Sequence, residues 1–204
     1  MAKLSTPKGK LVRKLGVNIF GNPKFDRLLS KKGYGPGQHG KSGKRFSTYS
    51  VQLKEKQKIK FTYGMLEKQF RNYYKEASRM QGITGENLLV LLESRLDNVI
   101  YRAGFASTRP QARQLVSHRH FKVNGRFVDV PSHQIKVGDQ IEIKDGSKEL
   151  IIIQHTIDTG QDKEIPSWLD VDVKKKAVKI NSLPSRSDAS SQIEEQLIVE
   201  LYSK

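Results

Sequence analysis

The first 47 residues set the strongest limit on what this chain can fold into, because they offer little with which to build a hydrophobic core. They hold eight glycines and twelve lysines and arginines, and their apolar residues follow neither a helical nor a strand spacing. Such a segment buries too little apolar surface to offset the entropy lost on ordering. We therefore expect residues 1–47 to form an extended basic arm that orders against a partner, the alternative being a disordered tail.

Positive charge is concentrated in the first two fifths of the chain. Residues 1–80 contain 20 Lys and Arg against four Asp and Glu, whereas residues 81–204 contain 17 of each sign, so the formal charge of +16 resides in residues 1–80. A field of this strength attracts polyanions, among which nucleic acid is the expected partner. An anionic membrane surface and a merely solvated surface are the alternatives.

Several classes of protein are excluded by what the 204 residues lack. The longest apolar run, Leu88–Leu92, has five residues and is far too short for a transmembrane helix. The basic N-terminus has no apolar stretch behind it and does not match a secretory signal. The absence of cysteine rules out disulfides, cysteine nucleophiles and thiolate zinc sites. We expect a cytosolic protein with no cofactor and no metal.

Residues 50–81 are expected to be helical, since apolar residues recur there at spacings of three and four while lysines and arginines occupy much of the remainder. Gly64 should break or bend this helix. The aromatic residues in the stripe could stack on bases, but at helical spacing they are more often core. Thr84 can cap the next helix, which runs to Gly104. We take residues 48–94 as a helical domain.

The pattern changes after Thr108. Thr108 is expected to cap a short helix, and Asn124-Gly125 between alternating residues predicts a hairpin with a type I′ turn. Further strands are expected near residues 140–143, 150–153 and 177–180. We therefore expect residues 95–159 to be an RNA-binding module of two short helices packed on a small, mainly antiparallel sheet, and the fold class to be α+β. Residues 160–204 could pack back on the helical domain.

Gly35–Ser42 matches the phosphate-loop pattern G-x-x-x-x-G-K-[ST] letter for letter. A nucleotide-binding loop follows a buried strand and opens a helix. The segment before Gly35 is too short and too charged to be a buried strand, and no parallel βαβ pattern follows the loop. We favour a basic glycine-rich loop that lies along an RNA backbone. The five histidines are scattered without carboxylates at ligand spacing, and no hydrolase motif occurs, so we expect neither a metal site nor an enzyme.

Long collinear stretches of the sequence resemble a known family. Leu91–Arg102, Gly104–Ala106, Gln111–Val116 and Val123–Gly125 are similar to the universal family of small ribosomal subunit protein four in its bacterial and organellar form. Shorter matches extend the resemblance over nearly the whole chain, and they comprise residues 36–40, 55–58, 63–64, 69–71, 166–169 and 195–202. Many members of that family hold zinc through four cysteines in the arm, and this chain departs from them because it has none.

The resemblance implies a protein of the cytoplasmic ribosome that binds the 5′ domain of small-subunit ribosomal RNA, nucleates assembly and contributes to decoding accuracy. It also implies contacts with small-subunit protein five and a place near the path by which messenger RNA enters. The module at 95–150 is similar as well to accessory domains of pseudouridine synthases and tyrosyl-tRNA synthetase, but the flanks leave no room for a catalytic domain. A DNA-compacting protein is the remaining alternative.

These considerations together predict a set of RNA contacts spread over the arm, the helical domain and the module. In the module, Arg109 and Arg113 are expected to share one exposed helix face, and seven bases against one acid between residues 95 and 126 give a local charge of +6. No residue is expected to be catalytic or to bind a metal. The predicted contacts are Lys8, Lys10, Arg13, Lys14, Gly37, Gln38, His39, Lys41, Lys44, Arg45, Lys54, Lys56, Lys58, Arg71, Arg109, Arg113, His118, Arg119, Lys122, Asn124 and Arg126.

Overall fold

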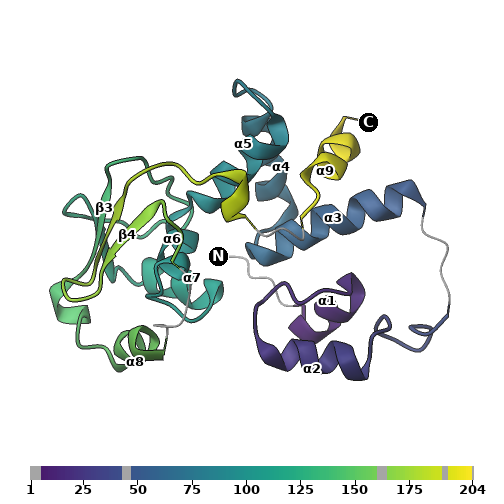
Figure 1. Cartoon of the computed structure of the whole chain (residues 1–204), viewed down its shortest axis with the longest axis horizontal. Coiled ribbons are helices and arrows are strands. Elements are labelled where there is room, and N and C mark those ends of the chain that lie inside the picture. The colour runs from purple at the N-terminus through teal and green to yellow at the C-terminus, as the bar shows by residue number, and fades with distance from the viewer. Residues whose placement is uncertain (1–5, 43–46, 160–164, 190–192, 204) are drawn as a thin grey trace. The chain divides into compact units, whose positions relative to one another are not determined.

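The computed structural model describes residues 6–42, 47–159, 165–189 and 193–203. It separates the chain into two compact units, one made of residues 1–85 and 191–204 and the other of residues 86–190 (Figure 1). The described part of the first unit is helical. The second combines helices with an antiparallel sheet, which confirms the expected α+β class. This division falls nine residues before the boundary that the sequence suggested between residues 94 and 95.

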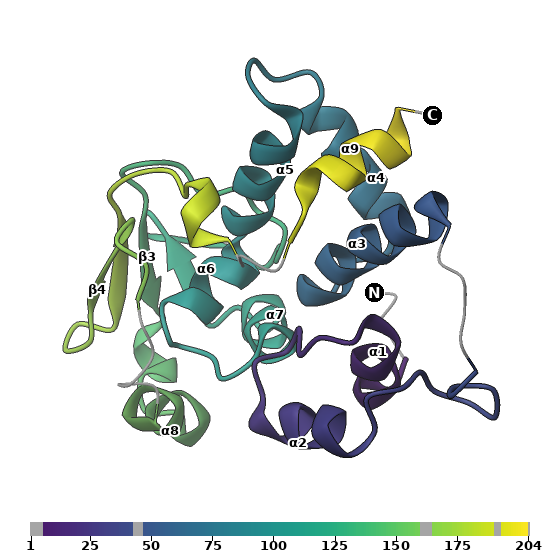
Figure 2. The same cartoon turned by 45° about the vertical axis from the view of Figure 1, so that its right-hand side comes forward.

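The basic arm contains two short helices, α1 (Lys8–Leu15) and α2 (Pro23–Lys31), which lie side by side (Figures 1 and 2). The prediction of an extended arm is therefore wrong over these residues. Leu11, Val12 and Leu15 on α1 are almost fully buried, and Asn22 caps α2 by accepting a hydrogen bond from a backbone N–H. Two turns with three buried residues are too short to show a period in the sequence, so the signal was missed.

Three further helices follow in the chain: α3 (Thr48–Thr62), α4 (Glu67–Ala77) and α5 (Thr84–Glu93). The predicted interruption at Gly64 is confirmed, since this residue has φ +63°, a conformation that favours glycine. Ile59 on α3 and Phe70 on α4 are fully buried, so these members of the apolar stripe are core. The predicted cap at Thr84 coincides with the first residue of α5.

The C-terminal helix α9 (Glu195–Tyr202) belongs to the first unit and lies against α3 (Figure 2). The Gln52 side-chain amide donates a 2.8 Å hydrogen bond to Glu200. The rings of Tyr74 and Tyr202 stack with centroids 4.4 Å apart, and the Tyr202 hydroxyl donates to Glu67 at 3.3 Å. Contacts from both α3 and α4 therefore fix α9.

The second unit packs α6 (Leu96–Arg102) and α7 (Arg109–Ser117) against an antiparallel sheet of strand order β2-β1-β3-β5-β4. Its strands are β1 (Phe121–Val123), β2 (Arg126–Phe127), β3 (Gln140–Ile143), β4 (Leu169–Asp172) and β5 (Ala177–Ile180). The Thr108 cap on α7 is confirmed, and so is the Asn124-Gly125 turn, where both residues have positive φ. The core between helices and sheet includes Val99, Phe105, Phe121 and Ile141.

Two expectations about the C-terminal third require correction. Residues 151–153 begin the helix α8 (Ile151–Thr159) rather than a strand, because Ile153 and Thr156 are buried at helical spacing while Ile151 is exposed. Residues 160–204 do not act as one segment: β4 and β5 extend the sheet of the second unit, whereas α9 belongs to the first. Short 3₁₀ turns at Asp145–Ser147 and Arg186–Asp188 complete the described elements.

Candidate RNA-binding surface

The α1–α2 lobe, which we define as residues 6–42, carries the densest positive charge. Nine cations face a single acid, Asp26, and within the described ranges none of the nine makes an ion pair. All of them except Arg13 are exposed. The cations are Lys8, Lys10, Arg13, Lys14, Lys24, Arg27, Lys31, Lys32 and Lys41, whereas the predicted contacts Lys44 and Arg45 lie outside the described residues.

Arg13 is used inside the lobe to hold the glycine-rich loop. Its guanidinium donates to the carbonyl oxygens of Tyr34 at 3.1 Å and Gly35 at 2.8 Å, and it lies over the Tyr34 ring. Lys41 lies over the same ring, 5.2 Å from its centroid. These bonds show that Arg13 fixes the loop, while its predicted contact with RNA stays a prediction.

The loop itself is tightly folded. A Cβ on Gly40 would come within 2.0 Å of the Gly35 carbonyl oxygen, so only glycine fits there. Gly37, Gln38 and His39, three of the predicted contacts, form the exposed end of the loop. Helix α2 precedes it instead of a buried strand, so the setting of a nucleotide-binding phosphate loop is missing on that side.

The lysines of α3 are largely engaged within the protein. Lys56 binds Glu67 at 2.5 Å and Lys58 binds Glu55 at 2.6 Å, and both lysine side chains are less than one sixth exposed. Desolvation opposes ionisation of Glu67, but hydrogen bonds and attraction from Lys56 and Lys60 outweigh it and lower its pKa to about 2. Lys56 and Lys58 are thus less available to RNA than the sequence suggested.

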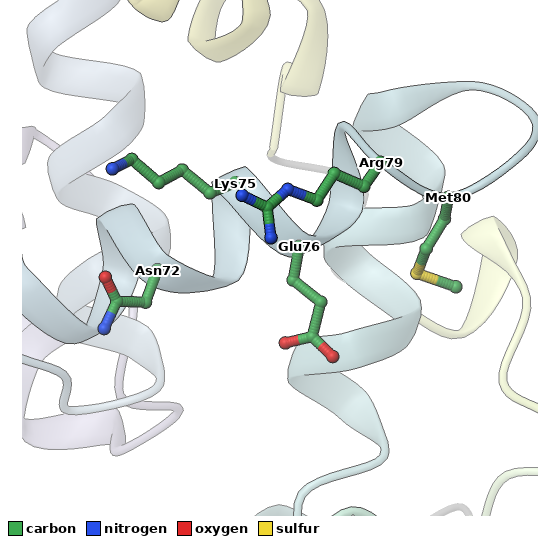
Figure 3. Close-up of a pocket in the computed structure, with 5 residues that line it drawn as sticks. All are labelled: Asn72, Lys75, Glu76, Arg79 and Met80. Carbon is green, nitrogen blue, oxygen red and sulfur yellow. The ribbon is translucent and has the colours of Figure 1, made fainter.

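The other predicted contacts of this unit are Lys54, which is half-buried on α3, and Arg71, which is exposed on α4. A shallow, open groove also lies along α4, lined by Asn72, Lys75, Glu76, Arg79 and Met80 (Figure 3). Its lining comes from that one helix and its end, and Glu76 offsets part of the positive charge. The groove therefore offers no converging set of groups that would define a ligand site.

In the second unit, the segment from Glu93 to Arg113 forms a buried polar network. Arg95, with 1% of its side chain exposed, donates to both oxygens of Asp97, at 3.0 and 2.7 Å. Glu93 is equally buried and accepts hydrogen bonds from Asn98 and Arg102. The sequence predicted one helix from Thr84 to Gly104, but a break at residues 94 and 95 divides it into α5 and α6 and brings these groups together.

Arg109 and Arg113 belong to this network and are both half-buried, so the expectation that they share an exposed helix face is wrong. Arg109 donates to the Asn98 side-chain oxygen at 2.8 Å and lies over the Tyr101 ring. Arg113 Nε lies 3.3 Å from an Asp97 oxygen, close enough for an ion pair although not aligned for a hydrogen bond. The charge count for residues 95–126 left out the acid Glu93, which lies just before that segment and belongs to the same network.

The predicted RNA-contacting cations that stay accessible on the second unit lie around the β1–β2 hairpin. Arg119 is mostly exposed and binds Asp129 at 2.8 Å, and Arg126 is exposed on β2. His118 is exposed after the end of α7. Lys122 lies 3.8 Å from Asp145 and 5.1 Å from the centroid of the Phe127 ring.

Two further observations describe this hairpin surface. Asn124, predicted to contact RNA, also closes the turn, since it donates to Asp139 and accepts from the Gln140 backbone. Burial lowers the pKa of His120, and repulsion from His118 and Lys144 lowers it further. Sequence reasoning missed Lys144 and Phe127 as candidate RNA contacts. Lys144 continues the alternation after the buried Ile141 and Ile143, and Phe127 pairs with the outward-facing Lys122 across the Asn124-Gly125 turn.

Other kinds of site find no support in the described ranges. No three His, Asp or Glu side chains there come close enough to hold a metal ion. No helix in the same ranges is long and apolar enough to cross a membrane. The features that remain are the cation-rich lobe and the hairpin surface.

Comparison with known proteins finds matches in both units. Residues 3–93 match the model of the ribosomal protein S4/S9 N-terminal domain, and residues 94–141 match the S4 domain. The chain is 51% identical to small ribosomal subunit protein uS4 of Acinetobacter baylyi over the full length of both. The chain belongs to the uS4 family. It is also 50% identical to uS4 of Shewanella loihica and 51% to that of Parabacteroides distasonis, again over whole chains.

Membership of the uS4 family confirms the resemblance found in the sequence. The family is one of ribosomal proteins and not of enzymes, in agreement with the expectation for this chain. Because the sequence contains no cysteine, this uS4 family member has no thiolate zinc site in its N-terminal part. Its α1–α2 lobe is instead held by Leu11, Val12, Leu15 and the Arg13 contacts.

Proposed function

We propose that this uS4 family member binds small-subunit ribosomal RNA in the cytoplasmic ribosome, through the 5′ domain of that RNA, and thereby nucleates assembly of the subunit. Its relatives are named small ribosomal subunit proteins, and one of its two matched domains is the S4 domain. The chain's formal charge of +16 favours a polyanionic partner.

The observation that carries the proposal is the unneutralised charge of the α1–α2 lobe. On α3, Lys56, Lys58 and Lys60 all have a carboxylate partner. In residues 6–42 nine cations make no ion pair within the described ranges, although their mutual repulsion destabilises a compact fold. Phosphates of a bound RNA would supply the missing negative charge, and the released counterions would add to the affinity.

The hairpin surface of the second unit would supply further backbone contacts. Arg119, Lys122 and Arg126 come from the end of α7 and from β1 and β2, so their spacing is set by the fold and not by one helix. Such an arrangement suits phosphates along a folded RNA, because A-form RNA is recognised mostly by shape and backbone contacts.

The salt dependence of binding tests this function. Lys8, Lys10 and Lys14 would be changed to Gln together, and affinity for the 5′-domain RNA would be measured from 50 to 300 mM KCl. Each lost phosphate contact should flatten the slope of log affinity against log salt by roughly 0.7–0.9. For three lost contacts, a slope flatter by about 2–3 is therefore expected.

A matched control removes the same charge from another exposed site. Lys174, Lys175 and Lys179 lie on or beside the β4–β5 hairpin, and all three are exposed. Changing them to Gln should leave the slope close to that of the wild type. Equal slopes for the two triple variants would refute the lobe as the RNA-binding surface.

The finer roles form the second part of the proposal: nucleation of assembly, contact with small-subunit protein five, a place near the path of messenger RNA entry, and an influence on decoding accuracy. Omission of the chain from a reconstitution should stop later proteins from joining the 5′ domain. Crosslinking in assembled subunits should recover protein five and messenger RNA. A misreading reporter should respond to variants of the chain, and an unchanged reporter would argue against the decoding role.

A further inference from the structure

We propose that Phe127 is a stacking platform for one unpaired RNA base, with the ammonium groups of Lys122 and Lys144 binding the phosphates on either side of it. This inference deepens the proposed function and rests on it. It adds a defined subsite for a single nucleobase to a surface that otherwise holds only the sugar-phosphate backbone.

The first step is the exposure of the ring. Phe127 lies on β2, which is an edge strand of the sheet, and 53% of the residue is exposed. Phe121, on the adjacent strand β1, is fully buried in the core. Alternation along β1 turns Lys122 outward, and Lys122 is the register partner of Phe127. The hairpin thus presents an aromatic ring and an ammonium side by side.

The second step is the position of the cations. The Lys122 and Lys144 ammonium groups lie 5.1 and 5.7 Å from the centroid of the Phe127 ring. A base stacks on an aromatic face more strongly than an exposed ammonium does. A base would therefore take the place of one lysine, whose flexible chain lets the ammonium move to an adjacent phosphate.

Acidic groups are present but do not cancel this charge. Asp145 lies 3.8 Å from Lys122 and is already bonded to Lys148 at 2.7 Å. Glu142, the register partner of Lys122 on β3, accepts a hydrogen bond from Gln140. These two acids face four cations, so the net charge of the surface stays positive. The four cations are Lys122, Arg126, Lys144 and Lys148.

The combination fits an unpaired nucleotide better than the other candidates. A protein partner that covered the ring would have to desolvate the two flanking ammonium groups, which is unfavourable without carboxylates. The bases of an RNA duplex have their faces stacked and cannot reach a ring on a strand edge, whereas single-stranded loops and bulges present theirs to aromatic side chains.

The first measurement compares conservative variants of the ring. Phe127→Leu keeps apolar bulk without an aromatic face, and it should weaken binding to the 5′-domain RNA about ten-fold, or roughly 1.4 kcal/mol. Phe127→Tyr keeps the aromatic face and should bind within about two-fold of the wild type. Because the ring is exposed, neither change should lower the melting temperature, which circular dichroism would verify.

The second measurement detects stacking directly. Phe127→Trp places an indole at the platform, while the native Trp168 is buried and serves as a constant background. Binding of the 5′-domain RNA should quench the new indole, and a fully paired duplex of equal length should not. The control is Val173→Trp, an exposed position between β4 and β5 at the other edge of the sheet, whose fluorescence should not change.

The outcomes separate this inference from the proposed function. Wild-type protein that fails to bind the 5′-domain RNA refutes both. Wild-type protein that binds, together with equal affinities of the Leu and Tyr variants and no quenching at position 127, refutes the platform alone. Quenching of the position-127 indole by a small-subunit protein, and not by RNA, would assign the ring to a protein contact and overturn the proposal.

Discussion

Removal of one charge from the buried network of the second unit tests how that unit is held together. Asp97→Asn keeps the shape of the side chain but removes the negative charge that Arg95 meets at Asp97. Arg95 is 1% exposed, and both of its bonds to Asp97 are short, so water cannot take over the lost interaction. Arg113, which approaches the same carboxylate, is 30% exposed and can turn toward solvent.

The size of the effect follows from burial. Loss of one partner of a buried ion pair destabilises a protein by about 3–5 kcal/mol, because an uncompensated charge remains in the interior. Typical domains have a stability of about 5–15 kcal/mol, so a large share would be lost. For a unit the size of residues 86–190, the melting temperature should fall by roughly 10–20 °C.

Thermal and urea unfolding, followed by circular dichroism, would measure the change. Asp129→Asn is the matched control, since Asp129 also accepts two hydrogen bonds from an arginine, Arg119, but at an exposed position. The control should melt close to the wild type, because exposed ion pairs are screened by water and salt. If Asp97→Asn were no more destabilising than the control, the buried network would not be a determinant of stability.

Arg109→Ala combined with Arg113→Ala should lower both the melting temperature and the affinity for RNA, because the two side chains join the network; loss of affinity at unchanged stability would show that they serve RNA alone. The pKa of Glu67 is lowered to about 2 from 4.5, so its contribution to stability is present above pH 4.5 and lost as the pH falls toward 2. Glu67→Gln should abolish that loss, about 1 kcal/mol after allowance for its half-exposed side chain, in melts between pH 6 and 2. Gly40→Ala should weaken RNA binding more than Lys41→Ala, because its Cβ would meet the backbone across the loop whereas Lys41 is one cation of nine; equal affinities for 5′-domain RNA would contradict this ranking.

Local signals in the sequence were sufficient for those elements whose geometry depends on neighbouring residues. The Asn124-Gly125 turn, the Thr108 cap and the interruption at Gly64 are all fixed by backbone preferences within a few residues. The long match with the uS4 family likewise required only the order of residues. The local signal misled at Ile151, where a run of β-branched residues suggested a strand and the spacing of the buried side chains gave a helix.

Only the tertiary structure decided which cations are available to a ligand. In the sequence, Lys58 on α3 and Lys10 on α1 are equally basic, but only Lys58 meets a carboxylate. Arg95 and Arg126 are the first and last cations of the same basic segment. Arg95 is buried against Asp97, whereas Arg126 is exposed on an edge strand. Charge is a property of each residue and can be counted along the chain. Its neutralisation depends on distances of a few ångströms between side chains, which are set when the helices and strands pack.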